Sequence, residues 1–192
     1  MKSLNFYFNR FLSVTVITAA IFCSCTAKAQ SFPASTSDLA DVFSEANLPF
    51  YKSKISPREF SLPSLAGETQ NLGALRGKVV FLNFWATWCG PCRLEMPSME
   101  ALYKQNREKG LEIIAINCGE GRQEVQAFMK ENGLSFPALL DEDGKVSSSY
   151  GIQAIPTSYI IDRNGNIVSR LVGSINWNTA KIQTAIEALL NS

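Results

Sequence analysis

Histidine is absent from this chain of 192 residues, and its absence excludes several kinds of site. A tetrahedral zinc site needs four ligands, usually cysteine or histidine. The chain has one Cys-x-x-Cys pair, Cys89 and Cys92, and no second pair that could complete such a site. Proteases with a Cys–His pair and histidine-based copper sites are excluded as well. The sequence therefore predicts neither a metal ion nor a cofactor.

A hydrophobic run long enough to span a membrane is also lacking. The apolar stretch 11–25 has 15 residues, whereas a spanning helix needs about 20. Basic residues precede the stretch, and an Ala-x-Ala cleavage pattern follows it at residues 27–29. Residues 1–29 are thus predicted to be a signal peptide or an N-terminal anchor.

The sequence leaves open what becomes of this N-terminal segment. Cleavage would release the chain, whereas an uncleaved segment or a lipid on Cys25 would tether it to a membrane. The residues before Cys25, Phe22-Cys23-Ser24, are a poor lipobox. In each case the chain is exported, and we expect it in the periplasm or cell envelope. That compartment is oxidising, so a dithiol there stays oxidised unless a reductant is supplied.

An excess of charge of one sign is missing too. The whole chain has 18 basic and 17 acidic residues. Without residues 1–29, 15 basic and 17 acidic residues remain, a net charge of −2. This balance indicates neither a nucleic-acid partner nor attraction to an anionic membrane surface.

What the chain does contain is the pentapeptide Trp88-Cys89-Gly90-Pro91-Cys92, directly after the apolar run 79–85. The run predicts a buried strand, and the residues after the pentapeptide predict a helix. Two thiols at that junction lie at a helix N-terminus, where the helix dipole and unpaired backbone N–H groups favour thiolate over thiol. The arrangement predicts a redox-active disulfide between Cys89 and Cys92.

The pattern of apolar residues and turns divides the rest of the chain into a spacer and a domain. Residues 30–55 are predicted to be a spacer with a short amphipathic helix, of which one turn packs on the domain. Residues 56–192 form the domain proper. Its expected elements are a hairpin around 66–68, strands 79–85, 111–117, 136–140, 157–161 and 167–172, and helical segments 91–109, 125–131, 146–150 and 179–190. This order predicts an α/β fold with a mixed sheet and helices on both faces.

With these motifs, residues 56–190 resemble the thioredoxin superfamily, and within it the TlpA/ResA type of exported thiol–disulfide oxidoreductase. The motifs are Phe60-x-Leu62-Pro63 with Gly67, Leu75-Arg76-Gly77-Lys78-Val79-Val80, Asn83-Phe84-Trp85-Ala86-Thr87-Trp88-Cys89, Cys92-Arg93-x-Glu95-Met96-Pro97 and Ile155-Pro156-Thr157. The resemblance implies a thioredoxin-like mixed central sheet flanked by helices, with an N-terminal β-hairpin extension. It also implies a cis peptide bond before Pro156, facing the disulfide.

Three residues are expected to be catalytic. Cys89 is the nucleophile that attacks a substrate disulfide, and Cys92 is the more buried thiol that resolves the mixed disulfide. Thioredoxins have a buried aspartate where this chain has Asn83, and an amide is neither an acid nor a base. We therefore expect Glu95, which the resemblance marks as functional, to transfer protons. The alternative is that Glu95 is a solvated acid favoured by the helix dipole.

Other residues are expected around this pair. The predicted substrate-binding residues are Trp88, Gly90, Pro91, Ile155, Pro156 and Thr157. Trp88 and Trp85 are also expected to pack around the pair and shield it. Cys118 ends a predicted buried strand and is expected to be a small core residue. The alternative for Cys118 is a third redox thiol.

The predicted function is an exported thiol–disulfide oxidoreductase that acts mainly as a reductase on envelope proteins. The resemblance suggests oxidised apocytochrome c as a substrate, during cytochrome c maturation, and a membrane thiol reductant of the CcdA/DsbD type as electron donor. Two alternatives remain. One is a thiol peroxidase related to peroxiredoxins, although those keep a threonine before a single peroxidatic cysteine. The other is a non-enzymatic metallochaperone, although such relatives use a CxxxC pair and a distal histidine.

Overall fold

The computed structural model describes residues 36–192, which belong to one compact unit. The predictions for residues 1–29 and for Cys25 lie outside these residues. The elements, in chain order, are α1 (Thr36–Glu45), β1 (Ser61–Pro63), β2 (Thr69–Asn71), the 3-10 helix η1 (Leu72–Leu75), β3 (Val79–Trp85), α2 (Gly90–Asn106), the 3-10 helix η2 (Arg107–Lys109), β4 (Leu111–Cys118), α3 (Arg122–Glu131), β5 (Ala138–Asp141), α4 (Lys145–Ser149), β6 (Thr157–Ile161), β7 (Ile167–Val172) and α5 (Ala180–Leu190).

The central sheet has five strands in the order β5-β4-β3-β6-β7. Strands β3, β4 and β5 run parallel, while β6 and β7 pair antiparallel. β1 and β2 form a separate antiparallel hairpin, which an isolated bridge between Ser64 and Leu139 joins to β5. The mixed sheet and its N-terminal hairpin confirm the predicted thioredoxin-like α/β fold.

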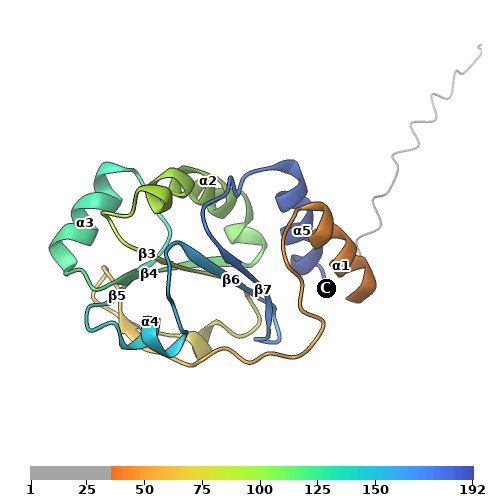
Figure 1. Cartoon of the computed structure of the whole chain (residues 1–192), viewed down its shortest axis with the longest axis horizontal. Helices are drawn as coiled ribbons and strands as arrows, with labels where there is room; N and C mark the ends of the chain where they lie inside the picture. Colours follow the sequence, from red (N-terminus) through yellow and green to blue (C-terminus); the bar gives the residue numbers. More distant parts are fainter. Residues whose placement is uncertain (1–35) are drawn as a thin grey trace, which may run out of the picture. The chain divides into compact units, whose positions relative to one another are not determined.

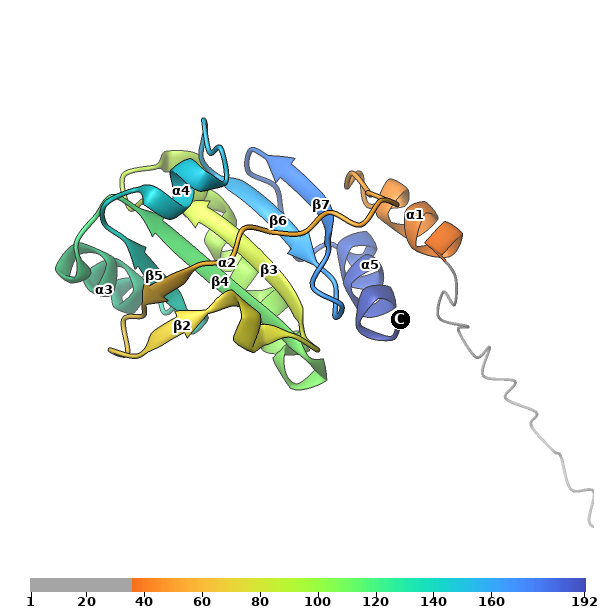
Figure 2. The same ribbon diagram turned by 90° about the horizontal axis from the view of Figure 1, so that it is seen from below.

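Helices cover both faces of the sheet, and β3 contributes to the core on each side. α1, α2, α3 and α5 lie toward one face, and α4 lies on the other (Figure 1). The chain between α1 and β1 crosses this second face (Figure 2). Because successive strand residues point to opposite faces, Phe81 and Trp85 join the core under α2, whereas Leu82 and Phe84 join the core on the other side. Burial of the whole strand follows from its central position.

Helix α1 is longer than the single turn expected in the spacer. It has 10 residues and packs against α5. Phe43 on α1 and Leu48 beyond it are buried in the core under α2. The ring of Phe43 also packs on Phe50, with centroids 5.1 Å apart. Residues 36–48 of the predicted spacer therefore contribute side chains to the core.

The ends of two predicted elements differ from those observed, for local reasons. The helix predicted over 91–109 stays α-helical to Asn106 and tightens to the 3-10 helix η2, before Gly110 takes a left-handed conformation with φ of 105°. β5 begins at Ala138, two residues later than expected, because Pro137 has no backbone N–H to donate. Between residues 36 and 192, no helix combines the length and apolar character needed to cross a membrane.

Candidate active site

Cys89 and Cys92 form a disulfide at the N-terminus of α2, with sulfur atoms 2.05 Å apart. Strand β3 carries the chain to this point, and Cys89 is the N-cap residue of the helix. The Sγ atom of Cys89 accepts the backbone N–H of Cys92 at 3.2 Å. Pro91 lies in the first helical turn, where its missing N–H costs no helical hydrogen bond. Local sequence thus explains why both sulfurs lie at a helix start.

The loop before β6 faces the disulfide. The peptide bond between Ile155 and Pro156 is cis, as the resemblance implies. The Cys89 Sγ atom lies 3.7 Å from the carbonyl oxygen of Ile155. Cys89 is 4% exposed and Cys92 is fully buried. Of the two sulfurs, Cys89 is therefore the one that an incoming disulfide can reach.

The other predicted substrate residues differ in exposure. Trp88, Gly90 and Pro91 are exposed at the helix start, Ile155 is half-buried, and Pro156 and Thr157 are buried. The Thr157 hydroxyl donates to the carbonyl of Ala154 at 2.7 Å. Substrate binding by these six residues remains a prediction.

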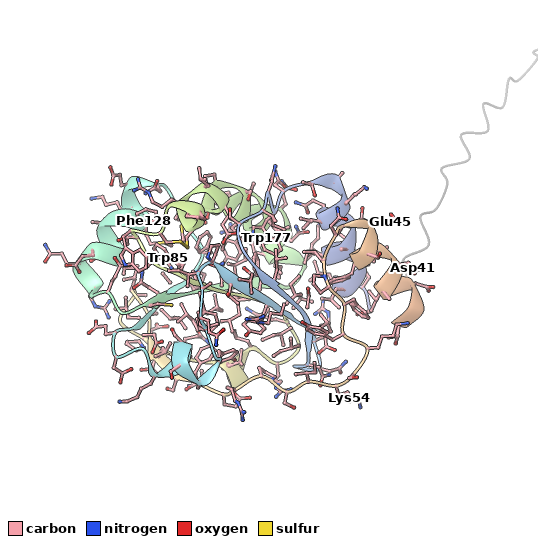
Figure 3. All side chains as sticks on the ribbon, viewed as in Figure 1. Asp41, Glu45, Lys54, Trp85, Phe128 and Trp177 are labelled. Carbon is pink, nitrogen blue, oxygen red and sulfur yellow. A yellow bond between two sulfur atoms is a disulfide. The ribbon has the colours of Figure 1, made fainter. Side chains whose placement is uncertain are left out.

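The two tryptophans near the pair have opposite surroundings. Trp88 is 71% exposed, because it lies in the loop after β3 has ended, and its shielding of the disulfide stays a prediction. Trp85 is buried, and its ring packs on Phe128 of α3 with centroids 5.2 Å apart (Figure 3). The guanidinium of Arg93 lies over the other ring of this contact, 5.8 Å from the centroid of Phe128. Trp85 and Phe128 belong to the same buried core cluster as Cys89 and Cys92.

Glu95 is buried three residues after Cys92, on the inner side of α2. Its Oε1 atom accepts an N–H of the Asn83 amide at 2.9 Å, and its Oε2 atom accepts the indole N–H of Trp177 at 2.9 Å. Burial raises the pKa of Glu95 from an ordinary 4.5 to about 7, against the hydrogen bonds of Trp177, Asn83 and the Ile175 backbone. The solvated-acid alternative for Glu95 does not fit this burial.

Asn83 links Glu95 to the strand that follows the cis proline. On β3 it is opposite Ser158 of β6, and its Nδ2 atom donates to the Ser158 hydroxyl at 2.9 Å. Among the described residues its Oδ1 atom has no hydrogen-bond partner. A fully buried amide with one free acceptor is costly unless that acceptor is used in another state of the site.

Sequence reasoning missed two residues that contact this site. Trp177 lies in the loop between β7 and α5, and no motif singled it out. Glu120 follows β4, and its carboxylate accepts the Thr87 backbone N–H at 2.7 Å, the Thr87 hydroxyl, and the Asn117 amide at 2.7 Å. Glu120 had a usable signal, because the carboxyl ends of the parallel strands β3 and β4 meet at one edge of the sheet.

Cys118 differs in its surroundings from the two disulfide cysteines. It is half-buried at the end of β4 and packs against the core on the α4 side of the sheet. The Ser147 hydroxyl lies 3.2 Å from its sulfur. Burial raises the pKa of the Cys118 thiol, although the Ser147 hydrogen bond opposes this. These features fit the expected packing role.

Together these groups allow thiol–disulfide exchange. Exchange requires a thiolate to attack and a proton to be released and returned. A carboxyl with a pKa of about 7, one helical turn from the buried sulfur, can accept or donate that proton at neutral pH. The fold and this pair, with a cis proline opposite, define a thioredoxin-like protein with a redox-active disulfide.

Comparison with known proteins gives the family. Residues 56–170 match the sequence model of the AhpC/TSA family, and the chain belongs to that family. It is 44% identical over 114 residues to the thiol-disulfide oxidoreductase ResA of Bacillus thuringiensis strain Al Hakam, covering 59% of this chain and 66% of that protein. It is 47% identical over 116 residues to ResA of Halalkalibacterium halodurans, covering 60% of this chain and 66% of that protein. These matches confirm the resemblance to the ResA type.

Solved structures agree with the fold. A thiol:disulfide interchange protein of the thioredoxin family from Chlorobium tepidum aligns with a TM-score of 0.64 at 28% identity, over 73% of this chain and 99% of that chain. StoA from Bacillus subtilis aligns with a TM-score of 0.58 at 29% identity, over 67% of this chain and 97% of that chain. The chain spans 66%, about two thirds, of the length of the two ResA proteins above.

Proposed function

We propose that this chain is an exported thiol–disulfide oxidoreductase that reduces disulfides of envelope proteins, with oxidised apocytochrome c among its substrates. The observation that carries the proposal is the Cys89–Cys92 disulfide at the start of α2, beside the cis-proline loop and one helical turn before the buried Glu95. The identity to proteins named thiol-disulfide oxidoreductase ResA supports the same reaction.

The reaction begins with the reduced dithiol. The Cys89 thiolate attacks one sulfur of the client disulfide, whose S–S bond breaks as the mixed disulfide forms. Cys92 then loses its proton to the Glu95 carboxylate and attacks the Cys89 sulfur. This step re-forms the Cys89–Cys92 disulfide, and the client leaves as a dithiol after its two sulfurs take one proton from Glu95 and one from solvent. The protein has lost two electrons to the client, and a membrane thiol reductant of the CcdA/DsbD type replaces them by reducing the Cys89–Cys92 disulfide.

The proposed location follows from the N-terminal segment. Residues 1–29 act as a signal peptide or anchor, residues 30–55 link that segment to the domain and contribute α1 to its core, and residues 56–192 carry the chemistry in the periplasm or cell envelope. Mass spectrometry of the mature protein from its own cells distinguishes the possible forms. A cleaved N-terminus near residue 30, a lipid on Cys25 and an intact N-terminus have different masses. Recovery of the unprocessed chain from the cytosol would contradict export.

The direct test is to trap clients with Cys92→Ser expressed in the native envelope. Without the resolving thiol the mixed disulfide at Cys89 persists, so the variant should accumulate adducts that dithiothreitol dissolves. Cys89→Ser is the matched control, because it has no nucleophile for the client and should form none of these adducts.

The identity of the trapped proteins decides the substrate. Apocytochrome c among the adducts, with loss of c-type haem on deletion of the gene and rescue by added thiol, supports the proposal. A broad set of exported proteins with c-type haem unaffected would indicate a general envelope reductase. Absence of adducts, with rapid consumption of hydrogen peroxide by the reduced wild-type protein, would replace the proposal with a thiol peroxidase.

A further inference from the structure

Trp177 is the one aromatic residue that hydrogen-bonds the buried acid among the described residues. It is 1% exposed, and its indole N–H donates to Oε2 of Glu95 at 2.9 Å. The other two tryptophans of the chain differ from it. Trp85 is equally buried, but its indole N–H has no partner among residues 36–192, and Trp88 is 71% exposed. Burial alone therefore does not explain why Trp177 faces Glu95.

The position of Trp177 is determined from three sides. Its ring packs on Phe81 of β3, with centroids 4.4 Å apart, so the indole lies between the sheet and α2 (Figure 3). Its backbone N–H donates to the Ser98 hydroxyl at 2.9 Å, and that hydroxyl donates to the carbonyl of Glu95 at 2.6 Å. The indole N–H is thereby held in one orientation toward the carboxyl.

The loop that carries Trp177 also contacts the cis-proline segment. The backbone N–H of Gly173, at the start of the loop, donates to the carbonyl of Pro156 at 2.8 Å. The same loop therefore contacts both the segment that faces Cys89 and the acid behind Cys92.

The two carboxyl oxygens of Glu95 face partners that differ in whether they can donate or accept a hydrogen bond. An indole N–H is a donor only, so the lone pair of Oε2 that faces Trp177 cannot hold a proton. The Asn83 amide beside Oε1 has both a donor and an acceptor. In the orientation observed its Nδ2 atom donates to Oε1, while its Oδ1 atom has no partner among the described residues. Half a turn of the amide would present Oδ1 to a proton on Oε1.

We propose that Trp177 is a positioning residue for Glu95. Its indole holds Oε2 as a hydrogen-bond acceptor and directs the exchanged proton to Oε1, and the Asn83 amide then rotates so that its Oδ1 atom accepts a hydrogen bond from the protonated Oε1. The use of this proton by the thiols rests on the proposed function. The hydrogen-bond arrangement does not rest on that function and can be tested without it.

The arrangement predicts how Glu95 responds to pH. The groups that hydrogen-bond the carboxyl are the Asn83 amide from β3, and the indole and the Ile175 backbone from the β7–α5 loop. These partners carry no charge. Burial raises the pKa of Glu95 to about 7, and Trp177 is the largest of the hydrogen-bond effects that oppose the rise. Removal of the indole N–H should therefore raise it further.

The first experiment follows the three indole N–H signals of the oxidised wild-type protein by nitrogen–proton NMR between pH 5 and 9. The Trp177 signal should move with a midpoint of about 7, because a neutral carboxyl is a weaker acceptor than a carboxylate. The side-chain amide signals of Asn83 should move with the same midpoint. The Trp85 and Trp88 signals should not titrate in this range. A Trp177 signal that stays constant while the Glu95 carboxyl titrates would overturn the proposal.

The second experiment measures the Glu95 titration by carbon NMR of labelled carboxyl groups, assigned with Glu95→Gln. Trp177→Phe keeps a ring and removes the donor, and it should raise the midpoint by about one pH unit. Trp85→Phe is the matched control, because it removes an equally buried indole N–H that has no partner. Its midpoint should stay at the wild-type value. Equal midpoints for both variants would reduce Trp177 to a packing residue.

The same variants separate this proposal from the proposed function. With the protein reduced, the rate of exchange with a model disulfide should follow the shifted Glu95 midpoint in Trp177→Phe. If the NMR midpoint shifts and the exchange profile does not, Trp177 positions Glu95 but the acid does not serve the thiols. If Cys92→Ser traps no client and the NMR midpoint still shifts, the function fails while the positioning role stands.

Discussion

At the residue scale, the carboxyl of Glu95 is held where its charge is disfavoured. Burial opposes ionisation, and the two hydrogen bonds from Asn83 and Trp177 restore part of the stability of the carboxylate. The balance leaves the group able to exchange a proton near neutral pH, which a typical solvent-exposed glutamate does not do. The same balance makes the stability of the protein depend on pH.

Glu95→Gln should change this pH dependence. The unfolded chain ionises Glu95 near 4.5 and the folded chain at about 7, so between these values the folded state binds one proton more. Wild-type stability therefore falls as pH rises through this window and is level above it. The variant lacks the titration, so its free energy of unfolding relative to wild type should rise by up to about 3 kcal/mol across the window. Urea unfolding of the oxidised proteins measures this difference.

Glu100→Gln is a matched control on the same helix. Burial acts to raise the pKa of Glu100, but the Ser135 hydrogen bonds and Lys104 outweigh it and lower the pKa below the ordinary value. Its contribution to stability is therefore lost only as the pH falls below 4.5 through the lowered value, and is constant between 4.5 and 7. Parallel stability curves for wild type and Glu95→Gln between pH 4.5 and 7 would contradict the burial argument.

Cys118→Ala should leave thiol–disulfide exchange unchanged. The sulfur is half-buried on the α4 side of the sheet, and burial raises the pKa of its thiol, so little thiolate forms at neutral pH. The lost packing should cost about 1 kcal/mol of unfolding free energy. Exchange rates and urea unfolding measure the two effects. A folded variant that lost activity would give Cys118 a redox role.

At the scale of elements, the loops at the carboxyl ends of β3 and β4 hold each other. Glu120 follows β4, and its carboxylate binds both the backbone N–H and the hydroxyl of Thr87, two residues before Cys89. The parallel pairing of β3 and β4 brings these loops together. The start of α2, with its disulfide, is thus supported by a neighbouring strand as well as by its own capping.

Glu120→Ala should loosen this support. Loss of hydrogen bonds to a carboxylate should lower the unfolding free energy by about 2 kcal/mol and slow the exchange reaction. The control is Glu124→Ala, an exposed acid in the first turn of α3 that should cost less than about 0.5 kcal/mol. Urea unfolding and the exchange rate are measured for both. Equal effects of the two changes would show that Glu120 acts only through its charge.

At the scale of the whole molecule, α1 completes the core on the α2 side of the sheet. Phe43 is fully buried there, together with Trp177 and residues of α5. The core that surrounds the redox site therefore includes residues that the sequence assigned to a spacer. Stability of the site should depend on this distant segment.

Phe43→Ala should lower the free energy of unfolding of the full chain by about 3–5 kcal/mol, because a buried aromatic side chain is lost and a cavity remains. Ser44→Ala, at an exposed position of the same helix, is the control and should change little. Thermal or urea unfolding measures the free energy of unfolding of both variants. A cost below about 1 kcal/mol would mean that α1 is only loosely attached.

Much of the fold could be predicted because local patterns determine it. The apolar run 79–85, the Asn-Gly turn between β6 and β7 and the glycine at 110 mark the elements without reference to the rest of the chain. The disulfide could also be predicted from the sequence, since both cysteines belong to one motif at a strand–helix junction. The ends of helices and strands were harder to predict, as the later start of β5 after Pro137 illustrates.

The sequence by itself therefore determined the class of fold, the redox pair and the candidate acid. Only the tertiary structure decided how that acid is held, since Glu95 binds Asn83 at 12 residues' separation and Trp177 at 82. It also decided that Trp85 is buried and Trp88 exposed, although three positions separate them. The physical reason is that a hydrogen bond or a burial depends on strand register and on the path of distant loops. No local pattern of residues determines strand register or the path of a distant loop.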